Sequence, residues 1–173
     1  MKNFLKVITL FFLFLHTSVS ADNSIAFVDV DNLISTSKPG LNVLKQLGNL
    51  RDDNIKDFKK KEKIIKENEE NILKQKNILS PDEFQTKINQ LKKEISKYNK
   101  YRDTKIKSFK QIKINNTNKL LNLINPIITE YASDKSISMI ILKKNIILGK
   151  AELDITKDII VLIDKKIKKF KIE

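Results

Sequence analysis

Apolar and polar residues divide the chain into stretches of different periodicity. Residues 24–30 (SIAFVDV) are β-branched and apolar and predict a strand. The following STSKPG predicts a turn, which can also cap a helix. A long charged segment then extends to about residue 125 with apolar residues at helical spacing.

The charged segment carries two apolar seams with coiled-coil spacing. In its first half one apolar residue recurs every seventh position, with Leu44 in the same register: Phe58, Ile65, Ile72 and Leu79. In its second half the steps alternate between four and three: Phe84, Ile88, Leu91, Ile95 and Tyr98. Both patterns predict helices that pack along one face.

Between the seams lies a helix-start signal. Ser80 suits an N-cap, Pro81 the first helical position and Glu83 the third, which together form a capping box. Because Pro81 disfavours helical geometry at the residue before it, the first helix is expected to end near Leu79.

The second helix is therefore expected to fold back along the first, pairing Ile72 with Ile88 and Ile65 with Ile95. About 35 residues per helix at 1.5 Å each give an arm of about 50 Å. The alternative, one long kinked helix, leaves both seams facing water. The second seam position of each heptad is polar near Glu62 and Glu69, so few apolar contacts stabilise the pairing of the two helices. We therefore expect the arm to be rigid near its root and mobile at its tip.

The second helix widens its apolar face toward its end, which predicts packing on a body. The residues are Leu120, Leu121, Leu123, Ile124, Ile127, Ile128 and Tyr131. Pro126 is expected to kink the helix or to restart it with Asn125 as a cap.

Beyond Ser136, the runs ISMIILKK and IILG predict a β-hairpin that meets the first strand in space. Asp154 or Thr156 is expected to cap a last helix. The predicted fold is α+β and mostly α: residues 22–38 and 126–173 form a small β body, and residues 39–125 form the hairpin arm with its tip at 79–83. A body this small argues for an oligomer.

The start of the chain has the layout of a secretory signal peptide, with Lys2 and Lys6 before an apolar run and small residues up to Ala21. A membrane anchor is the alternative, but the apolar run is shorter than the roughly 20 residues needed to span a bilayer. We expect cleavage after Ala21 and export to the periplasm of a chain that contains no cysteine. Cleavage removes Lys2 and Lys6 and lowers the formal net charge from +13 to +11.

The positive charge is compatible with nucleic acid, an anionic membrane surface or acidic protein partners, although a lysine-rich codon bias explains it equally well. Cations concentrate in the second helix. Candidate partner-facing residues there are Lys92, Lys93, Lys97, Lys100, Tyr101, Arg102, Lys105, Ile106, Lys107 and Lys110, with Tyr101 and Ile106 taken to lie off the seam.

Catalysis is not expected. The chain after residue 21 has neither histidine nor cysteine and no glycine-rich phosphate loop, so no cofactor or metal is expected. Asp29 and Asp31 are a carboxylate pair that can bind calcium or act as acid and base, but such a pair more often ends a strand and caps a turn.

IAFVDVDNLISTSKPG, the LSPDEF tip and MIILKKNIILGKAELDITKDIIVLID together resemble the Skp/OmpH family of periplasmic chaperones. The resemblance implies a homotrimer whose arms surround a cavity, where unfolded outer-membrane β-barrel proteins are held without ATP. It also implies an anionic lipid or lipopolysaccharide surface as a further partner. It places in the oligomeric body core Ile25, Phe27, Val28, Met139, Ile140, Ile141, Leu142, Ile146, Ile147, Leu148, Leu153 and Ile155, with Asp154 and Thr156 in the motif before the last helix.

Two other functions fit parts of the sequence. A basic nucleic-acid-binding protein fits the charge, but the chain has little arginine and no aromatic stacking platform. A structural coiled-coil spacer of the cell envelope fits the seams and needs neither cavity nor client.

Overall fold

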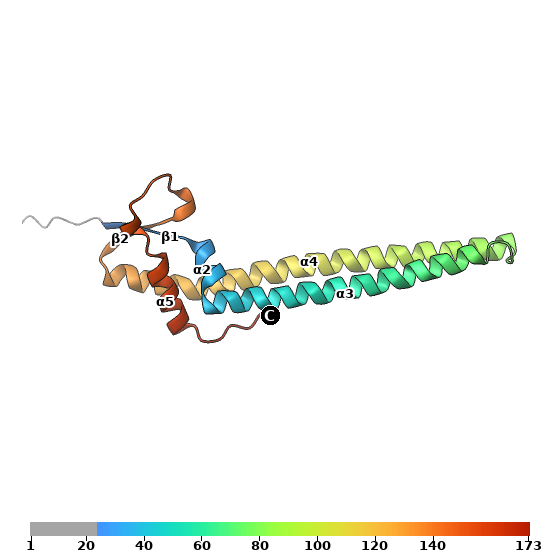
Figure 1. The fold of residues 1–173 in the computed structure, drawn as a ribbon, viewed down its shortest axis with the longest axis horizontal. Coiled ribbons are helices and arrows are strands. Elements are labelled where there is room, and N and C mark those ends of the chain that lie inside the picture. Colours follow the sequence, from blue (N-terminus) through green and yellow to red (C-terminus); the bar gives the residue numbers. More distant parts are fainter. Residues whose placement is uncertain (1–23) are drawn as a thin grey trace, which may run out of the picture.

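The structure, a computed structural model, describes residues 24–173 and shows a long two-helix arm projecting from a small body (Figure 1). The predicted signal peptide lies outside the described residues. In chain order the elements are β1 (Ser24–Val28), α2 (Val30–Thr36), α3 (Lys38–Lys74), α4 (Pro81–Asp134), β2 (Ile137–Leu142), the 3₁₀ turns η1 (Lys143–Asn145) and η2 (Ala151–Leu153), and α5 (Thr156–Lys166). None of the described helices has a stretch long and apolar enough to cross a membrane.

The predicted helical hairpin is confirmed. α3 and α4 lie side by side along the arm (Figure 1) and are joined by a turn over residues 75–80. α3 ends at Lys74, five residues before the predicted end, because tighter backbone hydrogen bonds such as Gln75 N–H to Ile72 O replace the α-helical pattern there. Cross-arm contacts, including Asn68 to Glu94, fall in the register that pairs Ile72 with Ile88.

α4 passes from the arm into the body without interruption, since Pro126 lies inside the helix. The predicted restart at Asn125 is therefore wrong. The ring of Pro126 is exposed, and the residues on either side of it, Ile124 and Ile127, are buried in the body. Tertiary packing on this face outweighs the one helical hydrogen bond that proline removes.

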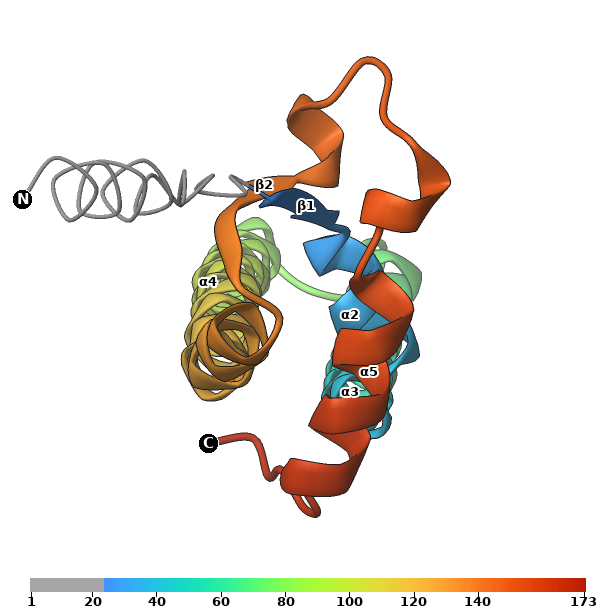
Figure 2. The same ribbon diagram turned by 90° about the vertical axis from the view of Figure 1, so that its left-hand side faces the viewer.

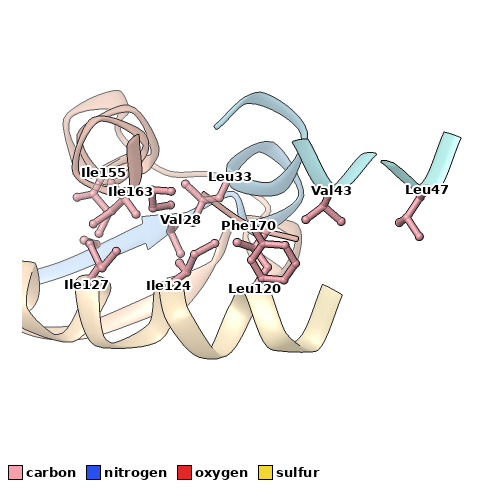
Figure 3. Packing of buried hydrophobic residues seen from close by; sticks show 12 residues of the cluster. Val28, Leu33, Val43, Leu47, Leu120, Ile124, Ile127, Ile155, Ile163 and Phe170 are labelled. Atoms are coloured by element: carbon pink, nitrogen blue, oxygen red, sulfur yellow. The ribbon is translucent and has the colours of Figure 1, made fainter. Parts of the chain in front are cut away.

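The body core forms where the end of α4 meets the start of α3 and the short elements around it. Leu120, Ile124 and Ile127 pack against α2, α3 and α5, as Figure 3 shows. The other members of this cluster are Ala26, Val28, Leu33, Val43, Leu47, Ile155, Ile159, Ile163 and Phe170. Seen along the arm, α5 lies beside the end of α4 and in front of the start of α3 (Figure 2), and it contacts both helices.

The short helix α2 replaces part of the predicted turn. The Asp29 carboxylate caps it by accepting from Asn32 N–H at 2.9 Å, and Ser37 ends it and caps α3. Gly40 permits the tight α2–α3 junction, since a Cβ at this position would lie 2.0 Å from the Ile34 carbonyl oxygen. The backbone N–H of Lys38 donates to Asp164 at 2.7 Å, which ties α5 to the same junction.

The sheet contains one pair of strands in the described residues. β1 and β2 run parallel, with Ala26 opposite Ile140 and Val28 opposite Leu142. The prediction that the first strand meets the later apolar segment is confirmed for β2. The predicted hairpin is wrong, because residues 146–150 form a loop and the only additional pairing is an isolated bridge between Phe27 and Asp154.

Candidate functional site

The sheet and the segment that follows it, up to Leu153, expose apolar side chains that together are called the outer apolar face. Of the predicted body-core residues, Phe27, Val28 and Ile155 are buried and Ile140, Ile141 and Ile146 are half-buried. Six others are exposed in the single chain: Ile25, Met139, Leu142, Ile147, Leu148 and Leu153. Ile147 and Leu148 are fully open at 105% and 92% exposure. They are not core residues of one chain, so this outer apolar face is available to a partner surface.

The loop after β2 is anchored beside this face. Lys143 donates to Asp154 at 2.8 Å, and Gly149 comes so near the Phe27 ring that a Cβ would lie 2.9 Å from it. Partial burial acts to raise the pKa of Asp154, but hydrogen bonds from Lys143 and Thr156 outweigh it and hold the pKa below its usual value. The same hydrogen bond raises the pKa of Lys143. The loop is therefore fixed at its base while its apolar tip projects.

The motif before α5 serves as a junction. The N-cap of α5 is Ile155, which provides no side-chain cap, so the prediction that Asp154 is the cap residue is wrong. Asp154 lies one residue earlier and accepts from the Thr156 N–H at 3.0 Å. Thr156 does not cap α5: it is the first helical residue, and its hydroxyl accepts from the Asp29 N–H at 2.9 Å. This bond joins the end of β1 to the start of α5.

Asp29 and Asp31 line a cleft of about 570 Å³ at the ends of the two strands, together with Lys143 and Lys144. Asp29 is occupied as the cap of α2, which is the structural role favoured from the sequence. Across residues 24–173 there is no group of three or more metal-ligating side chains placed to hold an ion.

The tip of the arm is fixed by the capping box. The Glu83 N–H donates to the Ser80 hydroxyl at 3.4 Å, and Glu83 accepts from the Ser80 N–H at 3.0 Å and from its hydroxyl at 2.7 Å. These hydrogen bonds lower the pKa of Glu83. Pro81 follows at the start of α4, so the chain reverses where the sequence places the signal.

The seam of the arm is only partly apolar. Leu91 is the one buried side chain in the arm beyond Leu47, and the seam residues Phe58, Ile65 and Ile95 are half-buried. Tyr98 and Tyr101 cross the seam and donate to Glu62 and to Asp57, the latter at 2.8 Å.

The prediction that Tyr101 lies off the seam is wrong. Its ring packs edge-on against Phe58, with centroids 6.4 Å apart, and Lys61 and Lys105 lie over it. Ile106 is 48% exposed, as expected for an off-seam residue. The alternating steps lead from Tyr98 to Arg102, so the seam pattern alone does not single out Tyr101, although residues three apart on a helix still lie on neighbouring positions of one face.

Charge is distributed unequally over the two helices of the arm. Between residues 87 and 113, α4 carries ten cations and only two carboxylates, Glu94 and Asp103. The predicted partner-facing cations are all exposed, namely Lys92, Lys93, Lys97, Lys100, Arg102, Lys105, Lys107 and Lys110. Within the described part of the chain none of the ten forms an ion pair, whereas five cations of α3 pair with carboxylates of their own helix, such as Lys63 with Glu67. The arm therefore presents one helix whose positive charge is partly balanced by carboxylates and one strongly basic helix.

The fold and this arrangement can be compared with known proteins. The model of the family described as outer membrane protein (OmpH-like) matches residues 24–163. The chain belongs to the OmpH-like family. This OmpH-like protein has the fold of a crystal structure from Caulobacter crescentus CB15 described as an outer membrane chaperone (OmpH-like), with a TM-score of 0.80, 12% identity, and coverage of 87% of this chain and 89% of that one. No curated protein matches the sequence. At the level of the family, the assignment supports a chaperone of outer-membrane proteins.

Proposed function

We propose that this protein is an ATP-independent periplasmic holdase that binds unfolded outer-membrane β-barrel proteins between basic arms and prevents their aggregation. The observation that carries the proposal is the unpaired positive charge of α4 on an arm that stands clear of the body. A binder of unfolded chains needs reach and attraction without a rigid site, and no catalytic step.

Assembly into a homotrimer is part of the proposal. The exposed apolar side chains of the sheet and of the loop after it, chiefly Met139 in β2 and Ile147 and Leu148 in the loop, support a contact between copies, because exposed apolar surface is costly to leave in water. Three copies joined at their bodies would place their arms around a common space. The subunit number comes from the family resemblance, and the export of the chain from the layout of residues 1–21.

The decisive experiment is suppression of aggregation. An outer-membrane β-barrel protein is diluted from urea into buffer with or without stoichiometric protein and no nucleotide, and light scattering is followed. Reduced light scattering in the presence of the protein supports the holdase function. Unchanged scattering excludes that function and favours the structural spacer. DNA binding at rising salt, measured in parallel, tests the nucleic-acid alternative, which requires DNA to bind more tightly than the unfolded client.

Matched charge reversals test the role of α4. Lys92→Glu, Lys93→Glu and Lys100→Glu together change an unpaired set, and Lys56→Glu, Lys63→Glu and Lys66→Glu change a paired set on α3 by the same charge. The α4 variant is expected to bind an acidic client about tenfold more weakly, with a reduced dependence on salt, and the α3 variant much less so. Equal losses of client affinity in the two variants would show that binding depends on the net charge of the protein and not on α4.

A further inference from the structure

Residues 167–173, the strap, leave the end of α5 and run along the root of the arm (Figure 1). Their side chains alternate in burial: Phe170 is 6% exposed and Ile172 packs against the core, whereas Lys169 and Lys171 are exposed. The Phe170 ring lies over Leu120 of α4 (Figure 3). From Lys169 to its end, the strap thus docks every second side chain.

Two carboxamides hold the strap by its backbone, one from each helix of the arm. Gln46 of α3 donates to Phe170 O at 3.0 Å and accepts from Ile172 N–H at 3.3 Å. Asn116 of α4 donates to Glu173 O and accepts from Glu173 N–H, both at 3.1 Å. Contacts to backbone groups do not depend on side-chain identity, so this side of the arm is suited to an extended polypeptide.

The side that holds the strap continues toward the tip as an open groove. Eighteen residues make five helical turns, or about 27 Å, and return to the same face. Ile64 is that distance from Gln46 on α3, and Tyr101 is that distance from Lys119, which pairs with Glu173, on α4. Ile64 and Tyr101 both line a groove of about 340 Å³. The groove is the strap's side of the arm, five turns farther out.

The chemistry of this groove suits an apolar side chain flanked by carboxylates. Its floor is formed by Ile64, Ile65 and the rings of Tyr98 and Tyr101, and Lys61 and Lys97 stand at its edge with Glu94. The two phenol hydroxyls are already bonded to Glu62 and Asp57, so the tyrosines offer their rings. Ile64 is 44% exposed and has room for a partner.

We propose that this groove binds extended segments of an unfolded client in which apolar residues alternate with acidic or polar ones. The proposal rests on the proposed function and names the arm face that contacts the client. The strap shows how such a segment lies on this side at the root, and membrane β-strands carry the required alternation. The opposite side of the arm has no docked segment and serves as the comparison.

The chain offers a matched control on the same helix. Ile55 and Ile64 are the same residue type, 42% and 44% exposed, and nine residues or two and a half turns apart, so they face opposite sides. A photo-crosslinking amino acid is placed at either position in the full-length protein, which is then loaded with an unfolded outer-membrane β-barrel protein. Ile64→Ser and Ile55→Ser are compared for client affinity, with circular dichroism and solution mass checked for both.

Crosslinking from position 64 is expected to exceed that from position 55 by at least about fivefold, and Ile64→Ser to weaken binding about fivefold while Ile55→Ser leaves it nearly unchanged. Equal crosslinking, or more from position 55, by a protein that still suppresses aggregation overturns the groove and leaves the holdase standing. If the unmodified protein does not suppress aggregation, the proposed function fails and the groove fails with it. Should a serine variant lose its fold, the crosslinking comparison decides.

Discussion

Asn116 holds the backbone of Glu173 with both ends of its side-chain amide: Nδ2 donates to the Glu173 carbonyl and Oδ1 accepts from the Glu173 N–H, each at 3.1 Å. Asn116 is 1% exposed, and its Nδ2 also donates to Ile112 O of its own helix at 2.8 Å. Every polar atom of this buried side chain is therefore used where the strap crosses α4.

Asn116→Ala is expected to lower the free energy of unfolding by about 1–3 kcal/mol, because it leaves backbone groups of the strap without partners. Asn118→Ala, an exposed change on the same helix, is expected to stay within about 0.5 kcal/mol. Urea unfolding followed by circular dichroism gives both values. Indistinguishable midpoints for the two variants would mean that the strap adds nothing to stability.

All three tyrosines are expected to ionise at higher pH in the folded protein than in the unfolded chain. Desolvation and the bond to Glu62 raise the pKa of Tyr98 to about 12, the bond to Asp158 raises the pKa of Tyr131 to about 12, and the bond to Asp57 raises the pKa of Tyr101. Since the folded state favours the neutral phenol, its stabilising effect is complete below pH 10 and disappears as the pH rises toward 12. Tyrosinate absorbance of the native protein should therefore rise at higher pH than that of the urea-unfolded chain, and coincident curves would contradict the cross-arm bonds.

Ser80→Ala is expected to fray the start of α4. Loss of an N-cap typically costs about 1 kcal/mol, so amide protection at the tip should fall about fivefold while the body is unchanged. Ser96→Ala, in the exposed middle of α4, should not reduce protection.

Because the pKa of Glu83 is lowered in the folded state, its stabilisation is present above pH 4.5 and is lost as the pH falls through the folded-state value. Hydrogen exchange of the tip peptides at neutral pH and near pH 3 checks both statements.

Leu148→Asp is expected to reduce the solution mass to that of a single chain, since it places a carboxylate in the outer apolar face. Ile78→Asp is the control, with an equally open isoleucine, 82% exposed, at the arm tip. Light scattering coupled to size exclusion measures the mass. An oligomer that survives Leu148→Asp, or a wild-type protein that is already a monomer, would exclude this face as the contact between copies.

Local signals explain what could be predicted. The Ser80–Pro81 start and the seam periodicities fix the hairpin, because capping and coiled-coil contacts are made between residues close in the sequence or in register. The Asp29 cap is a local helix-start signal for α2, but the STSKPG turn signal overlaps the end of this short helix and masks it in the sequence.

The features that the sequence did not predict correctly depend on contacts between residues far apart in the chain. Residues 146–148 are apolar and include two β-branched isoleucines, yet a strand needs a paired edge, and within the described residues none pairs with them. Pro126 stays within α4 because Ile124 and Ile127 of the same helix are buried in the body core. The strap's docking depends on Gln46 and Asn116, more than 50 residues away along the chain, and only the alternation of Phe170 and Ile172 hinted at it.

The continuity of α4 has a mechanical consequence. Its 54 residues extend for about 80 Å from the tip of the arm to the deepest layer of the body, with no break at Pro126. Such a helix acts as a lever whose short end is held in the body, where its Leu120, Ile124 and Ile127 are buried in the core cluster. Any sideways force on its long end therefore becomes a torque on the body, because no hinge at Pro126 separates the two ends of the helix.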